Sequence, residues 1–88
     1  MNIAIIGSGY VGLPLAIAFS KKFSVVCYDI DKKRIDSLKN GNDFNKQHSK
    51  KEILKNKIIF TNNINLIQNK DIFIITVPTP VNKKIIQI

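Results

Sequence analysis

The hydrophobic positions of this chain fall into short apolar runs that are separated by stretches with helical spacing. Four of the runs predict strands, at residues 2–6, 24–29, 58–61 and 71–77. The first run is apolar from Ile3 to Ile6 without alternation, which is typical of a strand that helices cover on both faces. Pro78 and Pro80 follow the fourth run and end it, because neither proline can continue a central ladder of hydrogen bonds.

Helices are predicted between these strands. The first is expected over residues 10–22, with Leu15, Ala16 and Phe19 on its inner face. Asp31 has the character of an N-cap, so a second helix should begin after it. Shorter helices are expected around residues 49–55 and over residues 62–70.

Strands and helices thus alternate along the chain. This order is typical of a parallel α/β sheet with right-handed crossovers. We therefore expect an incomplete, Rossmann-like, doubly wound parallel sheet of about four strands, in the order 3-2-1-4. The fourth strand then lies beside the first, and ligands of such sheets bind at the carboxyl ends of the strands, where the order reverses.

Length and composition limit the classes of protein that fit. A chain of 88 residues suffices for one small domain, and its 44% hydrophobic and 23% charged residues are ordinary for a soluble protein. The apolar run at 72–77 is too short to span a membrane, and Met1-Asn2 begins no secretory signal. A single cysteine, Cys27, excludes an internal disulfide and is expected to be a small buried hydrophobe. These features predict a cytoplasmic protein without a membrane partner.

The net charge of +8 is the feature that most favours another class, since a pI of 9.8 is typical of nucleic-acid binders. The lysines, however, are spread along the chain and are not interleaved with aromatic residues. We therefore interpret them as a solvated surface and expect no nucleic-acid partner. Binding to nucleic acid remains a competing hypothesis, and a steep dependence of affinity on salt would reveal it.

The first predicted strand runs directly into the motif GSGYVG at residues 7–12. A G-x-G-x-x-G motif between a strand and a helix is typical of dinucleotide binding. Gly7 permits the tight turn, Gly9 lets a pyrophosphate approach the backbone, and Gly12 lets the helix pack against the strand. The N–H groups and the dipole of the helix start then hold the phosphates.

Asp29 ends the second strand, 20 residues after Gly9. A carboxylate in this position can accept hydrogen bonds from both ribose hydroxyls of the adenosine half, and it repels a 2′-phosphate. The basic residues 32–34 favour a 2′-phosphate, but Asp29 occupies the strand tip, so we expect NAD rather than NADP. Thr79 follows the fourth strand, where its hydroxyl either contacts the cofactor or serves only a turn. His48 has no partner at ligand spacing, so we expect it to be exposed and expect no metal site.

The segments at residues 3–16, 28–41 and 75–80 together resemble the UDP-glucose/GDP-mannose dehydrogenase family. The sequences LPL at 13–15 and VPTP at 77–80 are most similar to the branch that acts on UDP-N-acetylhexosamines in polysaccharide synthesis. The resemblance implies an enzyme that oxidises the sugar C6 alcohol to a carboxylate with two NAD, through a cysteine and a lysine.

By motif position, the resemblance also implies cofactor contacts at Tyr10, Val11, Asp29, Arg34 and Thr79. On this view Arg34 flanks the adenosine and does not indicate NADP.

Members of that family are several hundred residues long, and their cysteine, lysine and sugar site would lie beyond residue 88. We therefore expect residues 1–81 to be the N-terminal part of an NAD-binding Rossmann domain, and residues 82–88 to be an irregular tail that departs from the family. The expected function is NAD binding within a nucleotide-sugar 6-dehydrogenase that is truncated here, with no catalytic residue and with the nucleotide sugar a partner only in a full-length enzyme. A stand-alone nucleotide-binding or regulatory module is the alternative. The fourth strand, apolar on both faces, would be an exposed edge that promotes self-association.

Overall fold

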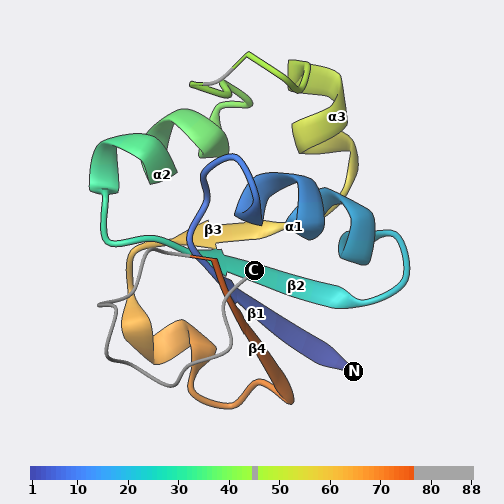
Figure 1. Cartoon of the computed structure of the whole chain (residues 1–88), viewed down its shortest axis with the longest axis vertical. Coiled ribbons are helices and arrows are strands. Elements are labelled where there is room, and N and C mark those ends of the chain that lie inside the picture. The colour runs from blue at the N-terminus through green and yellow to red at the C-terminus, as the bar shows by residue number, and fades with distance from the viewer. Residues whose placement is uncertain (45, 77–88) are drawn as a thin grey trace.

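The computed structural model describes residues 1–44 and 46–76, which form a four-stranded parallel sheet with the order β3-β2-β1-β4 (Figure 1). The strands are β1 (Asn2–Ile6), β2 (Ser24–Tyr28), β3 (Ile59–Thr61) and β4 (Ile72–Ile75). Ile3 of β1 lies opposite Val25 of β2 on one side and Ile72 of β4 on the other. The predicted α/β class, the parallel pairing and the strand order are confirmed.

The helical segments are α1 (Gly12–Ser20), α2 (Lys32–Lys39), α3 (Lys50–Lys55) and the 3-10 turn η1 (Ile64–Ile67). Figure 1 shows α1, α2 and α3 above the sheet and η1 below it. Right-handed crossovers explain this division. The connections from β1 to β2 and from β2 to β3 move along the sheet in one direction and place their helices on one face. The connection from β3 to β4 moves in the opposite direction and places η1 on the other face.

The two faces of the sheet are packed unequally. Side chains alternate along each strand, so Ile3 and Ile5 point toward α1 and α2, whereas Ala4 points toward η1. The helical face holds the main core, whose buried members are Ile3, Ile5, Leu13, Ala16, Ile17, Val25, Cys27, Ile35, Leu38, Ile53 and Phe60. The opposite face holds a small cluster in which Ile67 of η1 covers Ala4 and Val26.

Local sequence signals explain where α2 and α3 begin and end. The Asp31 carboxylate accepts the Arg34 N–H at 3.2 Å and caps α2. Ser49 and Glu52 form a reciprocal capping box at the start of α3. After α2 the chain turns at Gly41, whose φ of 81° lies in the left-handed region that favours glycine.

Several expectations about elements were wrong. The second strand ends at Tyr28 rather than at Asp29, and the first helix ends at Ser20 rather than at residue 22. The first helix begins at Gly12 rather than at residue 10, so that residues 10–11 belong to the preceding turn. Its buried positions are Gly12, Leu13, Ala16 and Ile17, with Leu15 and Phe19 only partly buried. The helix expected over residues 62–70 is one 3-10 turn, because only Ile67 of this polar stretch is anchored in the core.

The β4 strand pairs with β1 on one side, and no strand within residues 1–76 pairs with its other side. Its residues Ile72 and Phe73 remain exposed. In the described part of the chain, no helix is long and apolar enough to cross a membrane.

Candidate functional site

The turn after β1 is the centre of the candidate site. Gly7 has a φ of 109°, a backbone conformation that a side chain would strain, and its N–H donates to the Tyr28 carbonyl at 2.7 Å. This bond joins the end of β1 to the end of β2. The expected tight turn at Gly7 is therefore present and is held by the neighbouring strand.

Gly12 is required by close packing rather than by its backbone angles. A Cβ at this position would overlap the Gly7 carbonyl oxygen and would lie 2.8 Å from Thr76 Oγ1. The absence of a side chain thus lets α1 start directly against the turn, as the motif predicts.

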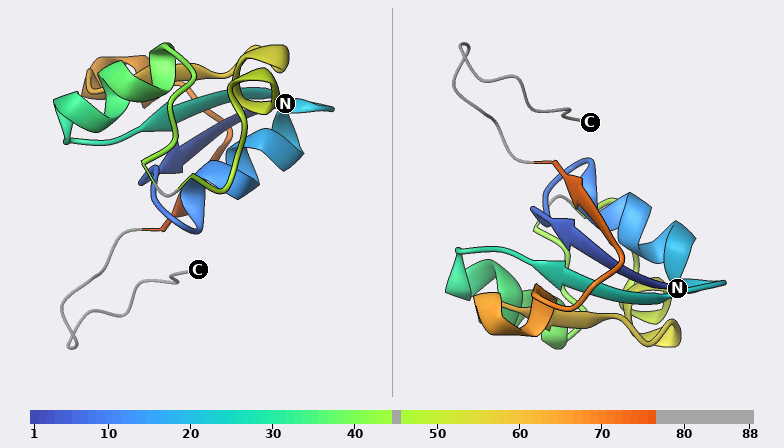
Figure 2. Two further views of the ribbon diagram at one scale, coloured as in Figure 1. Left: turned by 90° about the horizontal axis from the view of Figure 1, so that it is seen from above. Right: turned by 90° about the horizontal axis from the view of Figure 1, so that it is seen from below.

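Thr76 fixes the same turn from the β4 side, and it was not among the residues predicted for the site. Its N–H and its hydroxyl both donate to the Ile6 carbonyl, at 2.8 and 2.9 Å, and the hydroxyl also lies 3.3 Å from the Gly7 carbonyl. Figure 2 shows the end of β4 beside the turn that follows β1. A threonine at the end of the strand that neighbours β1 is the signal that would have indicated it.

Gly9, Tyr10 and Val11 form the open side of the turn. Tyr10 is 67% exposed and Val11 is also exposed. Val11 occupies the N-cap of α1 without a side-chain hydrogen bond, and the first turn of the helix contains no acidic residue. The Leu13 N–H donates to the Gly9 carbonyl at 3.2 Å and Pro14 has no N–H, so the N–H groups of Val11 and Gly12 are the ones at this helix start that suit phosphate oxygens.

Asp29 follows β2 and turns back toward this turn. Its Oδ2 accepts the N–H of Ser8 at 3.0 Å and the hydroxyl of Ser8 at 2.8 Å, and its Oδ1 accepts the N–H of Asp31 at 2.9 Å. Partial burial would raise the pKa of Asp29, but the bonds from Asp31 and Ser8 and the nearby Arg34 guanidinium outweigh burial and lower the pKa. Asp29 is therefore a fixed carboxylate at neutral pH.

Arg34 reaches from α2 to the glycine turn. A Cβ added to Gly9 would lie only 3.3 Å from Nη1 of Arg34. The guanidinium carbon of Arg34 is 5.6 Å from the centre of the Phe44 ring. Its Nε is buried and has no hydrogen-bond partner among the described residues. A cation with a spare donor beside a fixed carboxylate fits a dinucleotide, which supplies hydroxyl groups and phosphate oxygens. The structure thus brings Gly7, Gly9, Gly12, Asp29 and Arg34 together, whereas Thr79 lies outside the described residues.

Cys27 is not a nucleophile. It is buried in the main core, and its Sγ lies 3.6 Å from the Gly7 carbonyl oxygen. Burial, together with the negative charge of Asp29, raises the pKa of its thiol to about 12. The prediction that Cys27 is a small buried hydrophobe is confirmed.

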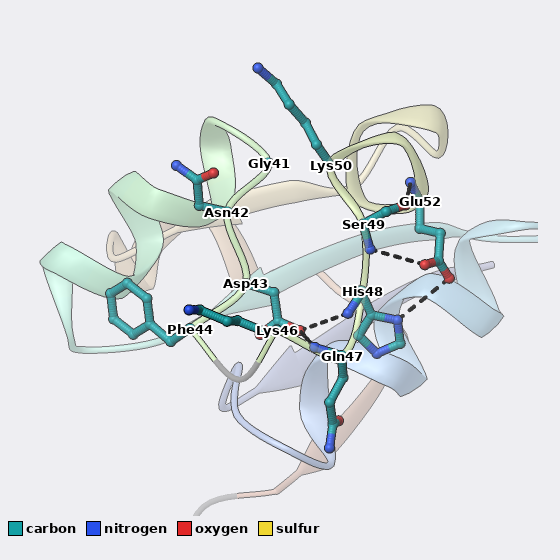
Figure 3. Close-up of a pocket in the computed structure, with 10 residues that line it drawn as sticks. All are labelled: Gly41, Asn42, Asp43, Phe44, Lys46, Gln47, His48, Ser49, Lys50 and Glu52. Atoms are coloured by element: carbon teal, nitrogen blue, oxygen red, sulfur yellow. Dashed lines mark hydrogen bonds and ion pairs between the residues drawn. The ribbon is translucent and has the colours of Figure 1, made fainter.

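The prediction that His48 is exposed, in contrast, is wrong. Its side chain is 17% exposed, and its Nδ1 lies 3.6 Å from Oε2 of Glu52 in α3. It lines a hollow of about 830 Å³ between α2 and α3 (Figure 3). The carboxylate of Asp43 in that hollow accepts the N–H groups of Gln47 and His48, and these hydrogen bonds stabilise the loop. No group of three or more potential metal ligands lies within residues 1–44 and 46–76.

Comparison with known proteins agrees with this geometry. The chain matches the UDP-glucose/GDP-mannose dehydrogenase family, NAD binding domain, over residues 1–86. It is 49% identical over 83 residues to UDP-N-acetyl-D-glucosamine 6-dehydrogenase of Salmonella typhi, covering 93% of this chain and 20% of that protein. It is 41% identical over 89 residues to UDP-glucose 6-dehydrogenase TuaD of Bacillus subtilis, covering 93% of this chain and 19% of that protein.

Solved structures show the same likeness. The UDP-N-acetyl-mannosamine dehydrogenase Cap5O of Staphylococcus aureus superposes with a TM-score of 0.75 at 34% identity, over 93% of this chain and 21% of that one. The chain spans about a fifth of the length of the curated relatives that it matches. The cofactor of this domain is NAD, and the chain belongs to the UDP-glucose/GDP-mannose dehydrogenase family, within its N-terminal NAD-binding domain.

Proposed function

We propose that this chain holds the adenosine diphosphate half of NAD at the carboxyl ends of β1 and β2. The pyrophosphate would lie at Gly9, Tyr10 and Val11 against the start of α1, with the adenosine ribose at Asp29 and Arg34 beside it. The observation that carries this proposal is the fixed, ionised Asp29, which Ser8 ties to the glycine turn.

The residues divide the work of binding. Gly7 and Gly12 shape the turn, while the N–H groups at the start of α1 face the phosphates. The Asp29 carboxylate accepts from ribose hydroxyls, and its negative charge opposes a 2′-phosphate. When bound, NAD supplies the hydride acceptor for an alcohol oxidation.

We further propose that the complete protein is a cytoplasmic nucleotide-sugar 6-dehydrogenase of polysaccharide synthesis. It would oxidise the C6 alcohol of a UDP-N-acetylhexosamine, or of UDP-glucose, to a carboxylate with two NAD. The activities by which the relatives from Salmonella typhi and Bacillus subtilis are named support this class of substrate. Residues 1–81 would then belong to the Rossmann domain, and Thr79 would add a contact to the cofactor.

The direct test is calorimetric titration of the chain with NAD and with NADP. The Asp29→Asn variant removes the charge, so NAD should bind about tenfold more weakly and the preference over NADP should shrink. Asp36→Asn is the matched control, because Asp36 is an exposed carboxylate on α2 that pairs with Lys32 at 3.0 Å. Equal affinities of the wild type and Asp29→Asn for NAD would exclude this site.

A second proposal concerns the outer edge of β4, which we expect to pair with a second copy of the chain. Unpaired strand edges with exposed apolar side chains favour association, and Phe73 is 48% exposed. Light scattering after size-exclusion chromatography should show a mass that rises with concentration and falls in Phe73→Lys. Leu54→Lys, at an equally exposed position on α3, should leave the mass unchanged. A monomer at all concentrations would refute self-association.

A further inference from the structure

Arg34, in the first turn of α2, brings its guanidinium to the glycine turn without a hydrogen bond to hold it there. Its Nη1 lies close to Gly9, since a Cβ added to that glycine would be 3.3 Å away. Within residues 1–44 and 46–76, the Arg34 side chain makes no hydrogen bond or ion pair, and its buried Nε has no partner. The electrostatic attraction between Arg34 and Asp29 has no preferred direction, so it does not fix the plane of the guanidinium.

Phe44 supplies the contact that orients this side chain. The guanidinium carbon of Arg34 lies 5.6 Å from the centre of the Phe44 ring, which is within the range of a cation–π interaction. The ring lies on the α2 side of the hollow, apart from His48 and Glu52 (Figure 3). The Arg34 guanidinium thus contacts an aromatic ring while its tip approaches the glycine turn.

The turn after α2 brings Phe44 back to Arg34, although ten residues separate their positions in the chain. The N–H of Gly41 donates to the Leu38 carbonyl at 2.9 Å, and the φ of Gly41 is 81°. A left-handed glycine with such a bond is typical of a helix end at which the chain changes direction. The Asp43 carboxylate then accepts two N–H groups of the loop and fixes the backbone next to Phe44. The loop backbone therefore sets the place of the ring, which is 51% exposed and lies outside the core.

We propose that Phe44 is a positioning residue of the cofactor site, which holds the Arg34 guanidinium in place before NAD binds. The inference rests on the proposed function, in which Arg34 lies beside the adenosine diphosphate half of NAD. A free arginine side chain has many rotamers, and fixing it during binding weakens the affinity. The ring of Phe44 removes this cost because the guanidinium is already ordered.

The test is a double-mutant cycle on the affinity of the full chain for NAD, measured by calorimetric titration. Phe44→Leu keeps an apolar side chain but has no aromatic face, and it should bind NAD about threefold to tenfold more weakly. Phe44→Tyr keeps the aromatic face and should bind NAD like the wild type. Arg34→Met should weaken binding about tenfold, and adding Phe44→Leu to it should change the affinity by less than about twofold.

Lys33→Met is the matched control, because Lys33 is an exposed cation next to Arg34 on α2. In that background, Phe44→Leu should weaken binding as much as it does in the wild type. The urea midpoint of Phe44→Leu should stay at the wild-type value, since the ring is half-exposed and outside the core. A merely structural role of Phe44 would lower this midpoint and would weaken binding equally with arginine or methionine at position 34.

Equal losses from Phe44→Leu in the wild type and in Arg34→Met would overturn the role of Phe44 and leave the proposed cofactor site intact. Wild-type affinity of Phe44→Leu would overturn it as well. If Asp29→Asn weakens binding and Arg34→Met does not, the inference fails while the ribose site stands. If neither substitution weakens the binding of NAD, the proposed site itself fails, and the inference fails with it.

Discussion

Replacing two glycines of the same motif by alanine should have opposite consequences. At Gly12 the new Cβ would overlap the Gly7 carbonyl oxygen and approach Thr76 Oγ1 to 2.8 Å. The carbonyl cannot yield easily, because the N–H of Gly7 is bonded to Tyr28 and the Thr76 hydroxyl is directed at the same strand end. At Gly9 the new Cβ would meet only the tip of the Arg34 side chain, at 3.3 Å.

The expected magnitudes differ accordingly. Overpacking against fixed backbone should lower the free energy of unfolding of Gly12→Ala by about 1–3 kcal/mol or more. That is a large fraction of the roughly 5 kcal/mol expected for a small domain. Gly9→Ala should be neutral or stabilised by up to about 1 kcal/mol, because alanine restricts the unfolded chain and the φ of Gly9 lies outside the left-handed region.

Urea unfolding followed by far-UV circular dichroism measures the stability of both variants, and calorimetric titration with NAD measures their affinity for the cofactor. Gly9→Ala should unfold like the wild type and bind NAD at least about tenfold more weakly, because its Cβ stands where the pyrophosphate approaches. A Gly12→Ala variant as stable as the wild type would refute the packing argument. Equal destabilisation by both substitutions would refute the assignment of different roles to the two glycines.

Three further predictions concern other residues of the site. Thr76→Val keeps the shape of the side chain but removes the hydroxyl bond to Ile6, so urea unfolding should show a loss of about 0.5–1.5 kcal/mol; an unchanged free energy would contradict the role of this bond. The pKa of Asp29 is lower in the folded state than its ordinary value of 3.8. The ionised Asp29 should therefore stabilise the fold above pH 3.8, and this stability should be lost as the pH falls through the pKa of the folded state. Urea midpoints measured from pH 6 to pH 2 should therefore fall less steeply at the acid end in Asp29→Asn than in the wild type, and parallel curves would argue against the shift. The Cys27 thiol, with a pKa of about 12, should resist iodoacetamide at pH 8 in the native protein and react once urea unfolds the chain; rapid native labelling would show that it is accessible.

The sheet was largely predictable from the chain, because its signals are local. Apolar runs without alternation indicated buried parallel strands, and the order of strands and helices then left few topologies. The helix predicted over residues 62–70 was too long, because helical spacing does not reveal that only Ile67 of this stretch packs in the core. The prediction that His48 is exposed was wrong for a similar reason, since the conformation of the loop before α3 determines how far this side chain is buried.

The sequence by itself determined the glycine motif, the acidic residue after the second strand and hence the class of ligand, because each depends on residue type and spacing. Tertiary structure decided which groups support that site. Ser8 and Thr76 are ordinary polar residues in the sequence, and only the parallel alignment of β1, β2 and β4 brings the Ser8 hydroxyl to Asp29 and the Thr76 hydroxyl to Ile6. Hydrogen bonds between residues that are distant in the chain depend on this alignment, and no local pattern encodes it.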